Sequence, residues 1–114
     1  MQFTILRFDT IGSTNDEAIK QTKFGANEGV CIVAEQQTKG RGRRERIWHS
    51  PKNAGLYVSL ILRPKLETKF WALITLSAAV AVHDAILETC GLQTDIKWAN
   101  DVHVNGKKLC GILA

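Results

Sequence analysis

The chain has 114 residues, a hydrophobic fraction of 45%, a charged fraction of 23% and a formal net charge of +4. The composition excludes a disordered chain. The length allows one hydrophobic core, but it is short for a complete two-substrate enzyme. No apolar run reaches the roughly 18 residues that a membrane span needs, and no secretory signal opens the chain. We therefore expect a cytoplasmic protein whose 3 cysteines are reduced.

The first half of the chain predicts two strands around a helix. Residues 2–8 predict the opening strand and residues 9–12 a turn. Ser13 then predicts a helix N-cap, with Asp16 three residues on as a variant of the capping box. Residues 29–35 are β-branched and almost wholly apolar, which is typical of a strand buried on both faces.

The second half predicts a strand at residues 55–63 and a long helix at residues 68–90, apolar around most of its circumference and therefore buried. A strand at residues 94–98 leads to a hairpin across Asn105-Gly106, the dipeptide favoured in a type I′ turn. This order predicts an α+β fold, a mixed β-sheet with helices packed against it. The chain stops inside an apolar strand pattern, so we expect a truncated or partial domain.

The connection at residues 36–54 has no apolar period, and its length suggests function. Within it, residues 39–46 (KGRGRRER) carry five positive side chains and one negative, a net charge equal to that of the whole chain, +4. Glycines alternate with the first arginines, so the backbone can approach a ligand while guanidinium groups reach around it. Such a loop suits a phosphate, a carboxylate or an acyl phosphate.

Polar chemistry and flexible backbone combine in three segments, residues 12–15, 37–46 and 97–111. The motifs in order are STN, AEQQTKGRGRRERIWHSP, GLYVSL, KWANDV and GKKLCGIL. Together they resemble the first part of the catalytic domain of biotin protein ligases, which attach biotin to a lysine of a biotin-dependent carboxylase. The resemblance implies a fold like that of class II aminoacyl-tRNA synthetases, and a partial catalytic domain over residues 1–114.

The resemblance also implies roles for individual residues. Ser13, Thr14 and Asn15 match the segment that hydrogen-bonds the ureido ring of biotin, although Ser13 also fits a simple helix cap. The other matches to positions around biotin and its adenylate are Gln37, Gly40, Arg41, Gly42, Arg43, Lys108 and Gly111. Among these, Arg43 and Lys108 are expected to act in catalysis by binding the carboxylate and the α-phosphate.

Asn100 and Asp101 match the Asn-Asp pair of the family near the triphosphate. Their oxygens suit Mg²⁺, which usually takes one or two protein carboxylates plus phosphate oxygens; a turn cap explains the same pair equally well. Two positions depart from the family pattern. Glu45 stands where many members have glycine, and Ala99 replaces the usual proline.

The reaction implied has two steps. The biotin carboxylate attacks the α-phosphorus of ATP to give biotinyl-5′-adenylate and pyrophosphate, and a lysine of a biotin carboxyl carrier protein then attacks the adenylate. Two alternatives stay open within this fold: a catalytically incomplete biotin-binding fragment and a lipoate ligase relative. A nucleic-acid-binding module is disfavoured because no aromatic platform accompanies the arginines, and no membrane partner is expected. An unpaired terminal strand favours association, and a homodimer is one assembly that it would allow.

Overall fold

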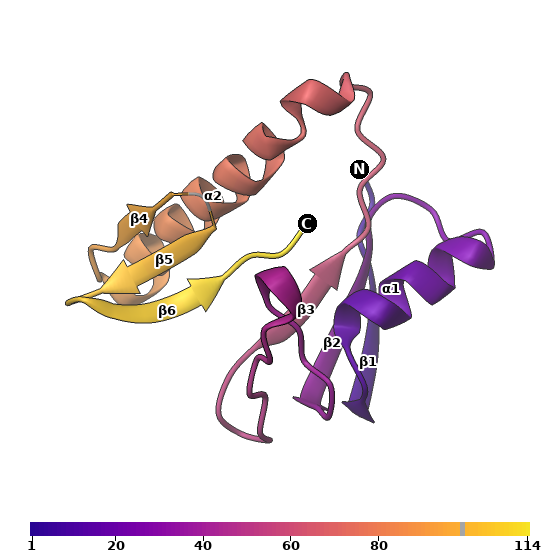
Figure 1. The fold of residues 1–114 in the computed structure, drawn as a ribbon, viewed down its shortest axis with the longest axis horizontal. Helices are drawn as coiled ribbons and strands as arrows, with labels where there is room; N and C mark the ends of the chain where they lie inside the picture. The colour runs from indigo at the N-terminus through magenta and orange to yellow at the C-terminus, as the bar shows by residue number, and fades with distance from the viewer. Residues whose placement is uncertain (99) are drawn as a thin grey trace. The chain divides into compact units, whose positions relative to one another are not determined.

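The computed structural model describes residues 1–98 and 100–114, so the departure at Ala99 lies outside the described residues. The chain divides into two compact units, Met1–Pro64 and Lys65–Ala114, and each contains a three-stranded sheet (Figure 1). In the first unit β1 and β2 run parallel while β2 and β3 run antiparallel. This pairing confirms the predicted mixed sheet. The elements of the first unit are β1 (Thr4–Ile11), α1 (Thr14–Lys23), β2 (Val30–Gln37), the 3-10 helix η1 (Arg43–Glu45) and β3 (Tyr57–Leu60).

The core of the first unit lies between its sheet and α1 (Figure 1). Ile32 of β2 is fully buried and packs with Ala18 of α1 and with Ile61. The prediction that β2 is buried on both faces is wrong. Its residues alternate, so that Ile32 and Ala34 are buried on the side of α1 while Glu35 is exposed.

The first strand is longer at its C-terminal end than the sequence predicts. The segment expected to form a turn continues the strand, because Thr10 pairs with Gln36 and Ile11 with Gln37 in the parallel ladder. The C-terminal ends of β1 and β2 therefore lie side by side, and the chain enters α1 directly after Ile11 and Gly12. This edge of the sheet carries several of the predicted site residues.

The second unit is an antiparallel sheet accompanied by a long helix. Its elements are the 3-10 helix η2 (Thr68–Phe70), α2 (Ala72–Cys90), β4 (Asp95–Lys97), β5 (Asp101–Val104) and β6 (Lys107–Gly111). Helix α2 ends at Gly91 in the left-handed conformation, and it packs along β4 and β5 (Figure 1). Asn105 and Gly106 have φ values of 50° and 78°, and two positive values are what the predicted type I′ turn requires.

The prediction that α2 is buried is wrong for this structure. Ala79 is the buried residue of α2 within the described chain, whereas Leu73 is 51% and Leu87 43% exposed. By length and composition alone the segment Thr68–Cys90 would suffice to cross a membrane, contrary to expectation, with a mean hydropathy of 1.8. One helix that passes this test by length and composition is weak evidence for a membrane span.

Candidate functional site

The N-terminus of α1 brings three of the predicted residues together. The Ser13 hydroxyl accepts a hydrogen bond of 3.3 Å from the backbone N–H of Asp16, which confirms the predicted N-cap. Ser13 and Thr14 are buried, and Asn15 follows them in the first turn. A helix N-terminus has free N–H groups and the positive end of the helix dipole, so it favours acceptor atoms of a ligand.

Ser59 of β3 belongs to the same cluster, although no role was predicted from the sequence for this residue of the GLYVSL motif. Its hydroxyl lies 2.8 Å from Thr14 Oγ1 and also hydrogen-bonds the side-chain oxygen of Asn15. Strand alternation puts Ser59 on the same face as the buried Tyr57, and a serine at an inward position of a strand needs a polar partner. That alternation was the signal in the sequence that could have identified it.

Gln37, at the end of β2, connects α1 to the segment that follows. Its Oε1 accepts a hydrogen bond of 2.7 Å from the Thr14 backbone N–H, and its Nε2 donates to Ser50 Oγ at 2.9 Å. The Ser50 hydroxyl lies 2.9 Å from the Trp48 carbonyl oxygen, to which it donates. The structure therefore brings Gln37 beside the predicted ureido-binding residues and holds its amide at both ends.

The arginine loop, defined here as residues 39–46, forms a small hairpin with the residues that follow. The Trp48 N–H donates to the Gly40 carbonyl at 2.8 Å, and the Gly42 N–H donates to the Arg46 carbonyl at 2.7 Å. The 3-10 helix η1 forms the tip of this hairpin. These bonds organise a segment for which the sequence predicts only a long polar connection.

The tip of the hairpin has an unusual backbone conformation. Arg44 and Glu45 have φ values of 56° and 61°, in the left-handed region that glycine adopts without strain. Glu45 stands at the position where many members of the resembled family have glycine. Glu45 therefore places a side chain at a left-handed backbone position, a conformation that favours glycine.

Arg41 is held in an ion pair at the start of α1. Its guanidinium lies 2.6 Å from the Asp16 carboxylate, and the two side chains are 44% and 57% exposed. Exposed pairs of this kind contribute about 0–1 kcal/mol, so an anionic ligand can compete with Asp16 for Arg41. Arg43, the other predicted anion-binding arginine, begins η1 at the hairpin tip.

The second unit brings together a separate group of predicted residues on the hairpin β5–β6. Lys108 Nζ lies 3.1 Å from Asp101 Oδ1, and Asp101 pairs with Gly111 across the ladder. Asn100 is tied to the same end of the hairpin, since its Nδ2 donates to the Ile112 carbonyl at 2.9 Å. Asp101 thus places a carboxylate directly beside the predicted catalytic lysine.

The donor set for a metal ion is small. Within residues 1–98 and 100–114, no three His, Cys, Asp or Glu side chains gather into a group that could hold a metal ion. Asp101 offers one carboxylate, and Lys108 already lies beside it. Asn100 and Asp101 therefore fit a Mg²⁺ ion that brings phosphate oxygens with it, and not an ion held by the protein alone.

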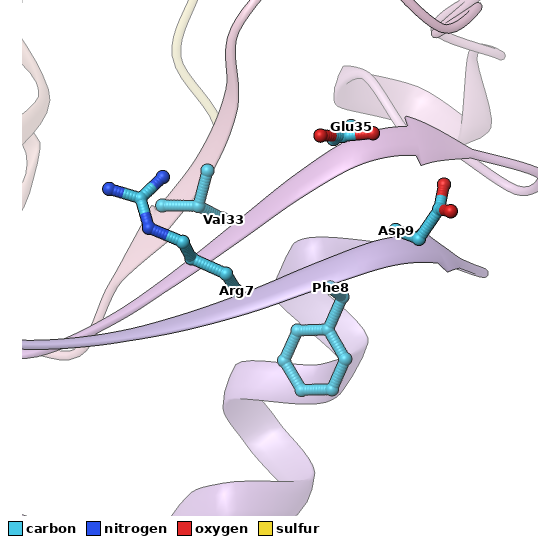
Figure 2. A pocket seen from close by; sticks show the side chains of 5 residues that line it. All are labelled: Arg7, Phe8, Asp9, Val33 and Glu35. Carbon is cyan, nitrogen blue, oxygen red and sulfur yellow. The ribbon is translucent and has the colours of Figure 1, made fainter.

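A hollow of about 210 Å³ lies on the first sheet, lined by Arg7, Phe8, Asp9, Val33 and Glu35 (Figure 2). Figure 2 shows Phe8 pointing toward the helix and the others pointing away from it. Lys52 Nζ lies 2.9 Å from Asp9 and 3.4 Å from Glu35, and its hydrogen bond to Asp9 lowers the pKa of that carboxyl. None of these residues is among the predicted site residues.

Residues 8–114 match the Biotin/lipoate A/B protein ligase family, and the chain belongs to this family. It is 47% identical over 109 residues to the bifunctional ligase/repressor BirA of Bacillus subtilis. It is 37% identical over 108 residues to the biotin–[acetyl-CoA-carboxylase] ligase of Mycobacterium tuberculosis. These alignments cover 96% and 90% of this chain but only 34% and 41% of the relatives, so the chain spans well under half of their length.

Solved structures of biotin protein ligases share the fold. The Aquifex aeolicus enzyme in complex with biotin and ATP is similar with a TM-score of 0.84 and 32% identity, covering 96% of this chain and 45% of that one. The Leishmania major enzyme in complex with biotinyl-5-AMP has a TM-score of 0.86 and 27% identity, with 99% and 52% covered. The predicted α+β fold of the biotin ligase type is thereby confirmed.

Proposed function

We propose that this chain carries the biotin- and adenylate-binding part of a biotin protein ligase. The observation that supports this most strongly is the assembly at the C-terminal edge of the first sheet. There the capped N-terminus of α1, the amide of Gln37 and the hairpin of the arginine loop are joined by hydrogen bonds. Acceptors bind well at the helix end, and anions bind well to the guanidinium groups.

The substrates proposed are biotin and ATP, with a biotin carboxyl carrier protein as acceptor. Ser13, Thr14 and Asn15 would bind the ureido ring, a polar group that matches the buried donors and acceptors around Ser59. Arg41 and Arg43 would bring the biotin carboxylate against the α-phosphate. Placing two anions together and neutralising the developing charge is enough for adenylation, because neither step needs a covalent nucleophile from the protein.

The second group, on β5–β6 of the other unit, would bind the nucleotide. Lys108 would contact the carboxylate and α-phosphate, and Gly111 would let the ligand lie against the strand. Asn100 and Asp101 would hold Mg²⁺ when it arrives with the triphosphate, where the ion neutralises phosphate charge. Since Lys108 already neutralises Asp101, this chain should show no calorimetric response to Mg²⁺ without ATP.

The decisive experiment is to mix the chain with biotin, ATP and Mg²⁺ and to measure pyrophosphate release. Release that depends on biotin supports the ligase. Biotin binding by calorimetry without release supports the alternative, an incomplete biotin-binding fragment of the same fold. A larger thermal shift with lipoate than with biotin supports a lipoate ligase relative instead. If neither vitamin binds, the proposal is wrong.

A further inference from the structure

Ser50 is not one of the predicted site residues, yet it occupies the centre of a series of hydrogen bonds. Its hydroxyl donates to the Trp48 carbonyl, which can only accept. A hydroxyl has one proton, so Ser50 Oγ must act as acceptor toward Gln37 Nε2. Gln37 therefore turns its oxygen to the other side, where it accepts from the Thr14 N–H.

These hydrogen bonds are buried, so the loss of one partner costs free energy. Ser50 is 4% and Thr14 5% exposed, so water does not replace a lost hydrogen bond at either end. A buried polar group without a partner costs more than the bond itself contributes in water. The hydrogen bonds within such a network also strengthen one another at low local dielectric. The orientation of the Gln37 amide is consequently set by Ser50.

Gly40 provides an independent sign that this arrangement is tightly specified. A Cβ atom at Gly40 would overlap the Trp48 carbonyl oxygen and would lie 2.6 Å from Ser50 Oγ and 3.0 Å from Gln37 Nε2. All three partners thus close over the backbone of one glycine of the arginine loop. No side chain fits between the loop and the bonded groups.

We propose that Ser50 is a positioning residue that couples the arginine loop to the N-terminus of α1. When the loop hairpin is in place, the Ser50 hydroxyl donates its hydrogen bond to the Trp48 carbonyl and orients the Gln37 amide toward Thr14. When the loop moves away, Ser50 can turn, and the Thr14 N–H loses a fixed acceptor. This inference rests on the proposed function for its consequence, which is that order in the loop and order in the ureido-binding segment rise and fall together.

The test measures amide hydrogen exchange at one end of this series of hydrogen bonds while a residue nearer the other end is substituted. Ser50→Ala should speed hydrogen exchange of the Thr14 amide about tenfold, as loss of one hydrogen bond predicts. Gln37→Met keeps the side-chain volume and should speed exchange of the Trp48 amide, because coupling between two sites is reciprocal. Ser59→Ala is the comparison, since it removes another buried hydroxyl near Thr14 but leaves the bond from the Thr14 N–H to Gln37 in place, and it should change the Trp48 amide less than Gln37→Met does.

The two variants decide the proposal without any ligand. Unchanged Thr14 exchange in folded Ser50→Ala, or unchanged Trp48 exchange in Gln37→Met, overturns it, and the second result decides alone if Ser50→Ala does not fold. A calorimetric titration with biotin then tests the consequence: Ser50→Ala should bind about tenfold more weakly, and Ser50→Thr, which keeps the hydroxyl, should recover binding. A wild-type chain that does not bind biotin defeats the proposed function but leaves the exchange result standing.

Discussion

The carbonyl oxygen of Trp48 occupies the space into which a side chain on Gly40 would project. The same carbonyl accepts a hydrogen bond from the Ser50 hydroxyl, while the Trp48 N–H donates to the Gly40 carbonyl. Gly40 and Trp48 therefore pack closely against each other at the base of the hairpin that the arginine loop forms. Gly42, two residues on, is different: a Cβ atom there would find its nearest neighbour at 3.5 Å.

This contrast predicts opposite outcomes for two alanine substitutions in one loop. Gly40→Ala should destabilise the chain by about 1–3 kcal/mol, the usual cost of forcing extra atoms into a packed site. Gly42→Ala should be neutral or should stabilise the chain by about 0.4–1 kcal/mol. The φ of Gly42, −105°, suits any residue, and alanine lowers the conformational entropy of the unfolded chain. Urea unfolding of both variants measures the difference. Equal effects of the two substitutions would contradict the geometry described here.

Arg43 is the loop residue whose removal should harm adenylation most. Without its positive charge the developing charge on the α-phosphate is less well neutralised, so Arg43→Ala should slow biotin-dependent pyrophosphate release by about 10²–10³-fold. Arg44→Ala removes the same charge from the neighbouring position and should have a much smaller effect. Adenylate formation at the normal rate by Arg43→Ala would show that the phosphate-binding role is assigned to the wrong residue.

The ion pair between Arg41 and Asp16 predicts a gain of affinity. In the proposed function the biotin carboxylate would displace Asp16 from Arg41, and exposed ion pairs of this kind contribute about 0.2–1 kcal/mol. Asp16→Asn should therefore tighten biotin binding by a factor of up to about five in calorimetry. Glu17→Gln, which removes a negative charge from the same helical turn without touching Arg41, is the matched control. Weaker binding by Asp16→Asn would indicate that the pair presents Arg41 to the ligand.

The features predicted correctly from the sequence are those that depend on near neighbours. The Ser13 cap needs only the Asp16 N–H three residues on, and the turn at Asn105-Gly106 needs only two residues that tolerate positive φ. The family motifs likewise sufficed to predict the fold of the chain.

The features that were missed depend on partners distant in sequence. Strand β1 continues through Ile11 because β2 pairs with it, which overrides the turn-forming residues. The contacts of Ser50 and Ser59 join residues 13 and 45 positions apart. Strand alternation indicates that Ser59 faces inward, but no local pattern indicates which residue it contacts. The long helix was expected to be buried from its composition, but burial also needs a surface to cover it, and composition does not provide that information.

Two adjacent lysines on β6 offer a test of the second group. Lys108 lies beside Asp101 and is expected to contact the carboxylate and α-phosphate, whereas Lys107 is expected to face solvent. Lys108→Ala should slow pyrophosphate release by about 10²-fold or more, as loss of a preorganised charge does. Lys107→Ala should change it less than twofold, on the order of a surface charge effect. A similar loss in both variants would mean that overall charge, rather than a specific contact, supports the reaction.

The same hairpin predicts the reactivity of the cysteines. Burial raises the pKa of the Cys110 thiol, and the nearby Asp101 carboxylate raises it further while Lys108 lowers it. Burial also raises the pKa of Cys31, so both thiols should ionise above their ordinary value of 9.0. Since the thiolate is the nucleophile, iodoacetamide at neutral pH should label the exposed Cys90 first.

The effect of Lys108 on the pKa of Cys110 can be checked with Lys108→Ala. Lys108→Ala removes a charge that lowers the pKa of Cys110, so labelling at this residue should become slower, and a higher pH should be needed to reach the same rate. Peptide mass mapping after timed labelling measures each cysteine separately, with Cys31 in the other unit as the internal control. Faster labelling of Cys110 in Lys108→Ala would mean that the loss of the lysine side chain uncovers the thiol, an effect of access that outweighs the change in charge.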